Sequence, residues 1–119
     1  MAANGTKQRR NPTETRERLL NAGIVLFADR GPDATTVEMI ARKARVNRRM
    51  LYHYFGSKDG LYRAVIRSMY ERSAEIEVEL AHILLPADEL LARIIRTYYD
   101  FLASHPEFVR LLTWENLHE

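Results

Sequence analysis

The apolar residues near the start of the chain recur every three or four positions, which is the period of an amphipathic α-helix. Asn11 suits the N-cap of this helix, and Pro12 suits its first turn, where a missing backbone N–H costs nothing. Gly31 and Pro32 are expected to end it. The pattern therefore predicts a helix over 12–30, whose apolar face holds Leu19, Gly23, Leu26 and Phe27.

Two short helices are predicted next, separated by a break at 45–47. Thr35 is expected to cap the first of them, with Glu38 reaching back to it in a capping box. Asn47 is expected to cap the second, which Gly56 ends. The first of these helices is about eight residues long on this pattern. The apolar side chains that should turn inward are Val37, Ile40, Ala41, Ala44, Leu51 and Phe55.

Three further helices complete the predicted fold. With Ser57 as its cap, the first runs from Lys58 to about Leu85, because no helix-breaking residue follows Gly60. Pro86 interrupts the chain before a strongly apolar helix, and His105-Pro106 separates that helix from a last one. No segment alternates apolar and polar residues between hairpin turns, so the fold class is predicted to be all-α.

The composition is that of a single soluble globular domain. The 119 residues are 46% hydrophobic and 29% charged, and they include no cysteine, which excludes a disulfide scaffold and a thiolate zinc site. The longest apolar run, 24–28, is far shorter than the roughly 20 residues of a membrane span. Residues 1–10 are polar and basic and contain no signal-peptide core. We therefore expect a cytoplasmic protein with no membrane partner and no cofactor.

The charge is unevenly divided along the chain. Residues 1–67 hold 14 Lys/Arg and 6 Asp/Glu (+8), whereas residues 68–119 hold 4 and 10 (−6). Such a division indicates that the first half meets a polyanion. A solvated helix face would normally mix both signs, but the densest run contains no acid. That run consists of Arg42, Lys43, Arg45, Arg48 and Arg49.

The two short helices and their break have the outline of a helix-turn-helix. Ala41 provides the small residue that two closely crossing helices need, Val46 follows the turn, and Leu51 lies ten residues after Ala41. Because two short helices bury too little surface, the helix over 12–30 should complete a three-helix core. We therefore expect domains at 11–58 and 59–119, preceded by a flexible basic arm at 1–10 that carries Lys7, Arg9 and Arg10.

Specific strings within 13–67 resemble the DNA-binding domain of the tetracycline-repressor (TetR) family of transcription regulators. The strings are Thr35-Thr36-Val37, Ile40-Ala41, Val46, Leu51-Tyr52-His53-Tyr54-Phe55, Ser57-Lys58 and Leu61. The resemblance implies that the helix after Asn47 enters the major groove of double-stranded DNA, where Arg–guanine contacts discriminate by about 1–3 kcal/mol. The candidate DNA-binding residues are Thr36, Arg45, Asn47, Arg48, Arg49, Met50, Tyr52, His53 and Lys58.

These residues have different expected roles. Arg48, Arg49 and Met50 are expected to contact base edges, and Asn47 is interpreted as a structural cap. The resemblance places Tyr52, His53, Thr36 and Lys58 on backbone phosphates. Two positions depart from the family pattern, which usually has glycine where this chain has Arg45 and often a small residue near Arg49. If the turn requires positive φ, Arg45 costs about 1–2 kcal/mol, so either the turn differs or Arg45 compensates by contacting phosphate.

The resemblance further implies a ligand-responsive repressor that is a homodimer in its full-length form, binds a palindromic operator and responds to an unknown small-molecule effector. Residues 59–119 would then be part of a regulatory domain. Tyr98, Phe101 and Trp114, with Tyr99 and Phe108, are candidates for its ligand pocket, although aromatic residues at helical spacing also suit a core. A competing hypothesis is a non-enzymatic helical module whose basic stripe binds an acidic protein or a membrane surface. No catalytic constellation accompanies His53, and scattered histidines predict no metal site.

Overall fold

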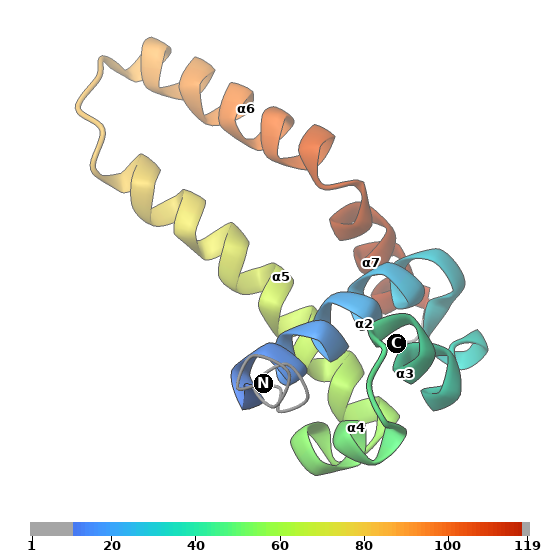
Figure 1. Ribbon diagram of the computed structural model, residues 1–119. Helices are drawn as coiled ribbons and strands as arrows, with labels where there is room; N and C mark the ends of the chain where they lie inside the picture. Colours follow the sequence, from blue (N-terminus) through green and yellow to red (C-terminus); the bar gives the residue numbers. More distant parts are fainter. Residues whose placement is uncertain (1–10, 118–119) are drawn as a thin grey trace. The chain divides into compact units, whose positions relative to one another are not determined.

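The computed structural model describes residues 11–117, which form six α-helices and no strand. The predicted arm at 1–10 lies outside the described residues. The all-α prediction is confirmed, and Figure 1 follows the helices from blue to red. They are α2 (Pro12–Ala34), α3 (Val37–Ala44), α4 (Arg48–Phe55), α5 (Lys58–Ala81), α6 (Ala87–Ser104) and α7 (Pro106–Leu117).

The chain divides into two compact units, and the division falls within α5, between Val65 and Ile66. The first unit, here called the N-terminal unit, therefore extends past Lys58 and includes the first two turns of α5. The second, the C-terminal unit, contains the rest of α5 together with α6 and α7.

The N-terminal unit is a helical bundle with an apolar core. In Figure 1, α2 lies against α3 and α4, and these three helices contact one another in every pair. Gly23 allows the first turns of α5 to approach α2, since a β-carbon there would lie 3.2 Å from side-chain atoms of Leu61 and Val65. The expected three-helix core is therefore extended by α5. Its fully buried apolar side chains are Leu19, Phe27, Ile40, Leu51, Leu61 and Val65.

The end of α2 and the start of α3 differ in detail from the sequence prediction. Helical geometry breaks at Gly31, which has φ 83°, and Pro32 begins one more turn. The N-cap of α3 is Thr36, whose hydroxyl accepts from the Met39 amide at 3.2 Å. Thr35 was expected to be this cap, but it is fully buried and donates its hydroxyl hydrogen to the Gly31 carbonyl at 2.8 Å. The cap thus moves by one residue because the Thr35 hydroxyl is used to close the break at Gly31 within α2.

The C-terminal unit consists of amphipathic helices. The long helix α5 ends at Ala81 rather than near Leu85, and its last turn tightens into bonds such as His82 N–H to Glu79 O. Residues 83–86 are not helical, and Pro86 disfavours helical geometry at Leu85, the residue before it. Between α6 and α7, the Phe101 ring packs edge-on against Phe108, with the ring centroids 5.3 Å apart.

Candidate nucleic-acid interface

The turn that joins α3 to α4 is closed by Arg45. This residue has φ 58° and ψ 46°, the left-handed conformation that glycine usually supplies. Its N–H donates to the Arg42 carbonyl at 3.2 Å, and the Val46 N–H donates to the Ala41 carbonyl at 3.0 Å. This pair of bonds is the Schellman pattern of a helix C-terminus. The departure from glycine therefore does not change the turn, and Arg45 bears a conformational cost of about 1–2 kcal/mol.

Helix α4 is fixed at both ends. Asn47 caps it, as predicted, by accepting from the Arg49 amide at 2.9 Å. Leu51 anchors its middle in the core with no exposed surface. At its C-terminal end, the Arg16 guanidinium of α2 lies 5.0 Å from the centre of the Phe55 ring, a cation–π contact. Phe55 is thus half-buried beneath a charged side chain rather than fully in the core.

The junction of α4 with α5 depends on a second close approach. Ser57 caps α5, as predicted, because its hydroxyl accepts from the Gly60 amide at 2.9 Å. A β-carbon on Gly60 would lie only 2.0 Å from the Phe55 carbonyl oxygen, so no larger residue fits there without movement of the backbone. Gly56 reverses the chain with φ 81° but has open space around it. The orientation of α4 is therefore set by backbone geometry as well as by its core residue.

The outward face of α4 presents three side chains of the predicted set. Arg49, Tyr52 and His53 are exposed, and the His53 ring packs edge-on against Tyr54 with the centroids 4.8 Å apart. Arg49 has no ion pair with any residue from 11 to 117. Met50 is half-buried. A cation at the first turn of an anchored helix, with aromatic donors one turn further on, is chemically suited to phosphates and base edges.

Arg48 is also exposed, but its side chain forms an ion pair with Glu38 of α3. Its guanidinium Nη1 lies 2.5 Å from Oε2 of Glu38, the second residue of α3, and both side chains remain more than half exposed. The basic run contains no acid in sequence, but the fold supplies one from ten residues earlier. A hydrogen bond from its own backbone amide, followed by the bond from Arg48, holds the pKa of Glu38 below its usual range. The predicted capping box is therefore wrong, because Glu38 pairs with Arg48 instead of reaching back to Thr35.

Two predicted phosphate contacts have internal partners that leave donors available. Thr36 uses its oxygen as an acceptor for the α3 cap, so its hydroxyl hydrogen can still be donated. Lys58 is half-buried and donates one of its three ammonium hydrogens to the Pro32 carbonyl at 2.8 Å. This bond ties the start of α5 to the residue that follows the Gly31 break within α2. Both residues also lie at helix N-termini, where anions are favoured.

Two contacts were not predicted from the sequence. Glu38 pairs with Arg48, and Arg16 of α2 contacts the Phe55 ring at the end of α4. Both contacts join separate helices, so no local spacing indicates them. The one sequence signal for the pair of Glu38 and Arg48 is that an acid stands at the start of α3 and a cation at the start of α4. Among the described residues, no group of three His, Asp or Glu is arranged to hold a metal ion.

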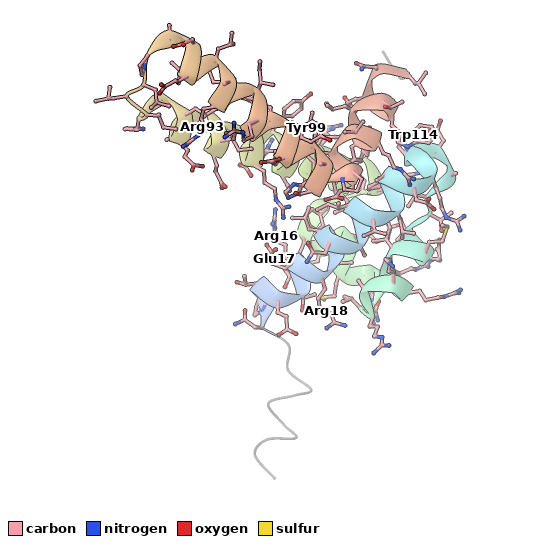
Figure 2. The ribbon with its side chains drawn as sticks, turned by 90° about the horizontal axis from the view of Figure 1, so that it is seen from above. Arg16, Glu17, Arg18, Arg93, Tyr99 and Trp114 are labelled. Carbon is pink, nitrogen blue, oxygen red and sulfur yellow. The ribbon has the colours of Figure 1, made fainter. Side chains whose placement is uncertain are left out.

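The proposed pocket residues lie on α6 and α7. The Tyr98 hydroxyl donates to Glu77 of α5 at 3.3 Å, and partial burial followed by the Glu77 charge raises the pKa of Tyr98. Phe101 stacks on His105 with the centroids 4.5 Å apart. Trp114, labelled in Figure 2, is half-buried on α7. None of the described helices combines the length and apolarity needed to cross a bilayer.

Comparison with known families agrees with this geometry. Residues 19–65 match the family described as "Bacterial regulatory proteins, tetR family", and residues 87–119 match a "Tetracyclin repressor-like, C-terminal domain". The chain belongs to the TetR family. The first match ends at Val65, where the N-terminal unit ends, and it includes the whole of α3, the turn and α4.

Individual relatives of this TetR-family chain are transcription regulators. It is 34% identical to the HTH-type transcriptional repressor NicS of Pseudomonas putida over 88% of its own length and 50% of that protein. It is 32% identical to the repressor SCO4008 of Streptomyces coelicolor over 91% of its length and 53% of that protein. A TetR-like regulator from Rhodococcus sp. RHA1 superimposes with a TM-score of 0.75 at 32% identity, covering 82% of this chain and 54% of that one. The chain thus spans about half the length of these relatives.

Proposed function

We propose that this chain is the DNA-binding part of a transcriptional repressor that recognises double-stranded DNA through α4. The observation that carries the proposal is Arg49, an exposed cation without an ion pair in the described chain, held on the first turn of an anchored helix. Tyr52, His53 and Lys58 supply phosphate donors around it. Arg45 adds a cation at the turn, where its left-handed backbone is retained despite the conformational cost.

The proposed operator is palindromic and the proposed functional form is a homodimer. One α4 covers one half-site, so two copies with recognition helices roughly 34 Å apart would read one turn of duplex. A single copy should therefore bind weakly and show a steep fall in affinity with salt, because each neutralised phosphate releases counterions. This salt dependence alone would also suit an acidic protein partner, so sequence preference is the discriminating property.

The proposed effector is a small molecule that contacts the C-terminal unit at Tyr98, Phe101 and Trp114. Support comes from the half-buried state of these aromatic rings and from the match of 87–119 to a repressor C-terminal domain. Since Trp114 is the chain's one tryptophan, its fluorescence gives a specific signal for ligands bound beside it. A compound that releases DNA and quenches this fluorescence over the same concentration range would support the assignment, and release of DNA without quenching would contradict it.

The test of DNA recognition is selection of duplexes from a random pool, followed by affinity measurements on the selected sequence. Arg49→Ala should weaken binding to the selected duplex by at least roughly tenfold and remove the preference at one base pair. Lys58→Ala should weaken all duplexes equally and lower the salt slope by about 1. Arg93→Ala removes a cation from α6 (Figure 2) and serves as the matched control, with binding within about twofold of the parent. Failure to enrich any sequence would reject the proposal.

A further inference from the structure

The ion pair between Glu38 and Arg48 joins the two helices of the helix-turn-helix. Arg48 is the first residue of α4, and its Nη1 lies 2.5 Å from Oε2 of Glu38. The partners are ten residues apart, so the contact depends on the fold and not on the period of one helix.

Neither stability nor affinity for a polyanion accounts for this pair. Both side chains are nearly 60% exposed, and an exposed ion pair contributes about 0–1 kcal/mol. At the same time, the carboxylate neutralises one cation of the run formed by Arg42, Lys43, Arg45, Arg48 and Arg49. A surface that only attracted phosphates would bind more tightly without the acid.

An acid beside a base-contacting arginine has two physical consequences. A guanidinium has five N–H donors in a planar fork, so the single bond to Glu38 restricts the orientation of the Arg48 side chain and leaves other donors for an acceptor. Holding a long side chain in place before binding lowers the entropy cost of ordering it. The negative charge also repels phosphates, which disfavours the sequence-independent contacts that Arg48 would otherwise make.

We propose that Glu38 is a positioning residue that sets sequence specificity by directing Arg48 toward base edges and away from phosphates. The inference rests on the proposed function, because it requires α4 to contact duplex DNA. It differs from a purely structural role in one respect: loss of Glu38 should change the choice among DNA sequences more than it changes the fold.

The experiment compares the affinity of the chain for the selected duplex with its affinity for a scrambled duplex of equal length and composition. For Glu38→Gln, the ratio of the two affinities should fall about tenfold, mainly through tighter binding to the scrambled duplex. The salt slope on the scrambled duplex should steepen by about 0.9, the value for one added phosphate contact. Far-UV circular dichroism should show the parent helix content.

Two further variants separate positioning from general charge effects. Glu17→Gln removes an equal charge from α2 of the same unit, where Glu17 is exposed and without an ion pair in the described chain (Figure 2), and it should leave the ratio unchanged. In an Arg48→Ala background, Glu38→Gln should have no further effect on the ratio, because the two residues act through one contact.

The outcomes distinguish this inference from the proposed function. An unchanged ratio in Glu38→Gln, or an equal fall in the Arg48→Ala background, overturns the role of Glu38 while leaving DNA recognition intact. A parent chain that prefers no duplex overturns both.

Discussion

The two units of the chain differ in what they do with their apolar residues. Of the sixteen buried hydrophobic residues in the described chain, thirteen lie in the N-terminal unit, from Leu19 to Val65. Of the eleven large hydrophobic residues that are exposed, nine lie in the C-terminal unit, between Tyr70 and Leu117. The N-terminal unit therefore holds most of the core, whereas much of the C-terminal unit's apolar surface faces solvent.

The exposed apolar residues of α6 form a stripe along one helix face. Leu91, Ile95, Tyr99 and Leu102 follow one another at intervals of three or four residues, and each is more than a third exposed. Figure 2 shows Tyr99 on this helix together with Arg93. An apolar stripe contributes to stability only when another surface covers it. The stability of this chain should therefore depend mainly on the N-terminal unit, which contains α4.

The largest expected effect is the loss of stability when a buried side chain of the N-terminal unit is truncated, compared with an exposed one of the C-terminal unit. Phe27 has no exposed surface and packs edge-on against Tyr62 with the centroids 5.1 Å apart, so Phe27→Ala should lower the free energy of unfolding by about 3–5 kcal/mol. Leu91→Ala, at a residue that is 59% exposed, should lower it by less than about 0.5 kcal/mol. Urea denaturation followed by circular dichroism measures both. Equal losses would mean that stability is shared by the two units.

A smaller effect is expected at the junction of α4 and α5. Gly60→Ala brings a β-carbon against the Phe55 carbonyl and should cost about 2–3 kcal/mol. Gly56→Ala meets no neighbour and incurs only the cost of positive φ, about 1–2 kcal/mol. The same denaturation experiment ranks the two variants. A Gly60 variant as stable as the parent would show that this junction tolerates backbone movement and does not fix α4.

A third prediction concerns the turn of the helix-turn-helix. Arg45→Gly removes the cost of a left-handed arginine but adds flexibility to the unfolded chain, so the free energy of unfolding should rise by about 0.5–1 kcal/mol. Thermal unfolding measures the gain. If Arg45 contacts phosphate, the same variant should bind DNA more weakly while being more stable. A variant that is more stable and binds unchanged would remove Arg45 from the proposed interface.

The smallest expected effect is a change in pH dependence within the N-terminal unit. Because the folded pKa of Glu38 is lowered, the unfolded state binds more protons in acid than the folded state does. The stabilisation from its carboxylate is thus complete above the unfolded pKa, about 4.3, and is lost as the pH falls through the folded pKa. Thermal unfolding from about pH 6 to about pH 3 should therefore decline less steeply for Glu38→Gln than for the parent. Parallel curves would mean that neither the backbone hydrogen bond of Glu38 nor its contact with Arg48 favours the carboxylate in solution.

The helices were predictable from the sequence because their signals are local. Periodic apolar residues, Pro12 after Asn11, the Asn47 and Ser57 caps and the break at Gly31 all act within one turn of chain, and the structure confirms each of them. The sequence left open whether the turn differs or Arg45 contacts phosphate, and the positive φ of Arg45 shows that the turn does not differ. Such features depend on a residue and its immediate neighbours.

The features that sequence reasoning missed join residues distant in the chain. Thr35 lost its predicted capping role because its hydroxyl reaches the carbonyls of Leu26 and Gly31 in the preceding helix. The bond of Lys58 to Pro32 and the pairing of Arg48 with Glu38 arise only once the helices are packed. The roles of the candidate DNA-binding and pocket residues remain predictions. Side-chain partners are a property of the tertiary fold, which no local pattern specifies.

The most direct test of the account is an NMR titration of the isotopically labelled chain with the selected duplex. If α4 recognises DNA, we expect saturable shifts concentrated at the amides of Thr36, of residues 48–53 and of Lys58, with the amides of α6 largely unmoved. Shifts centred on 87–117, or shifts of equal size with selected and scrambled duplexes, would contradict the claim that α4 recognises DNA.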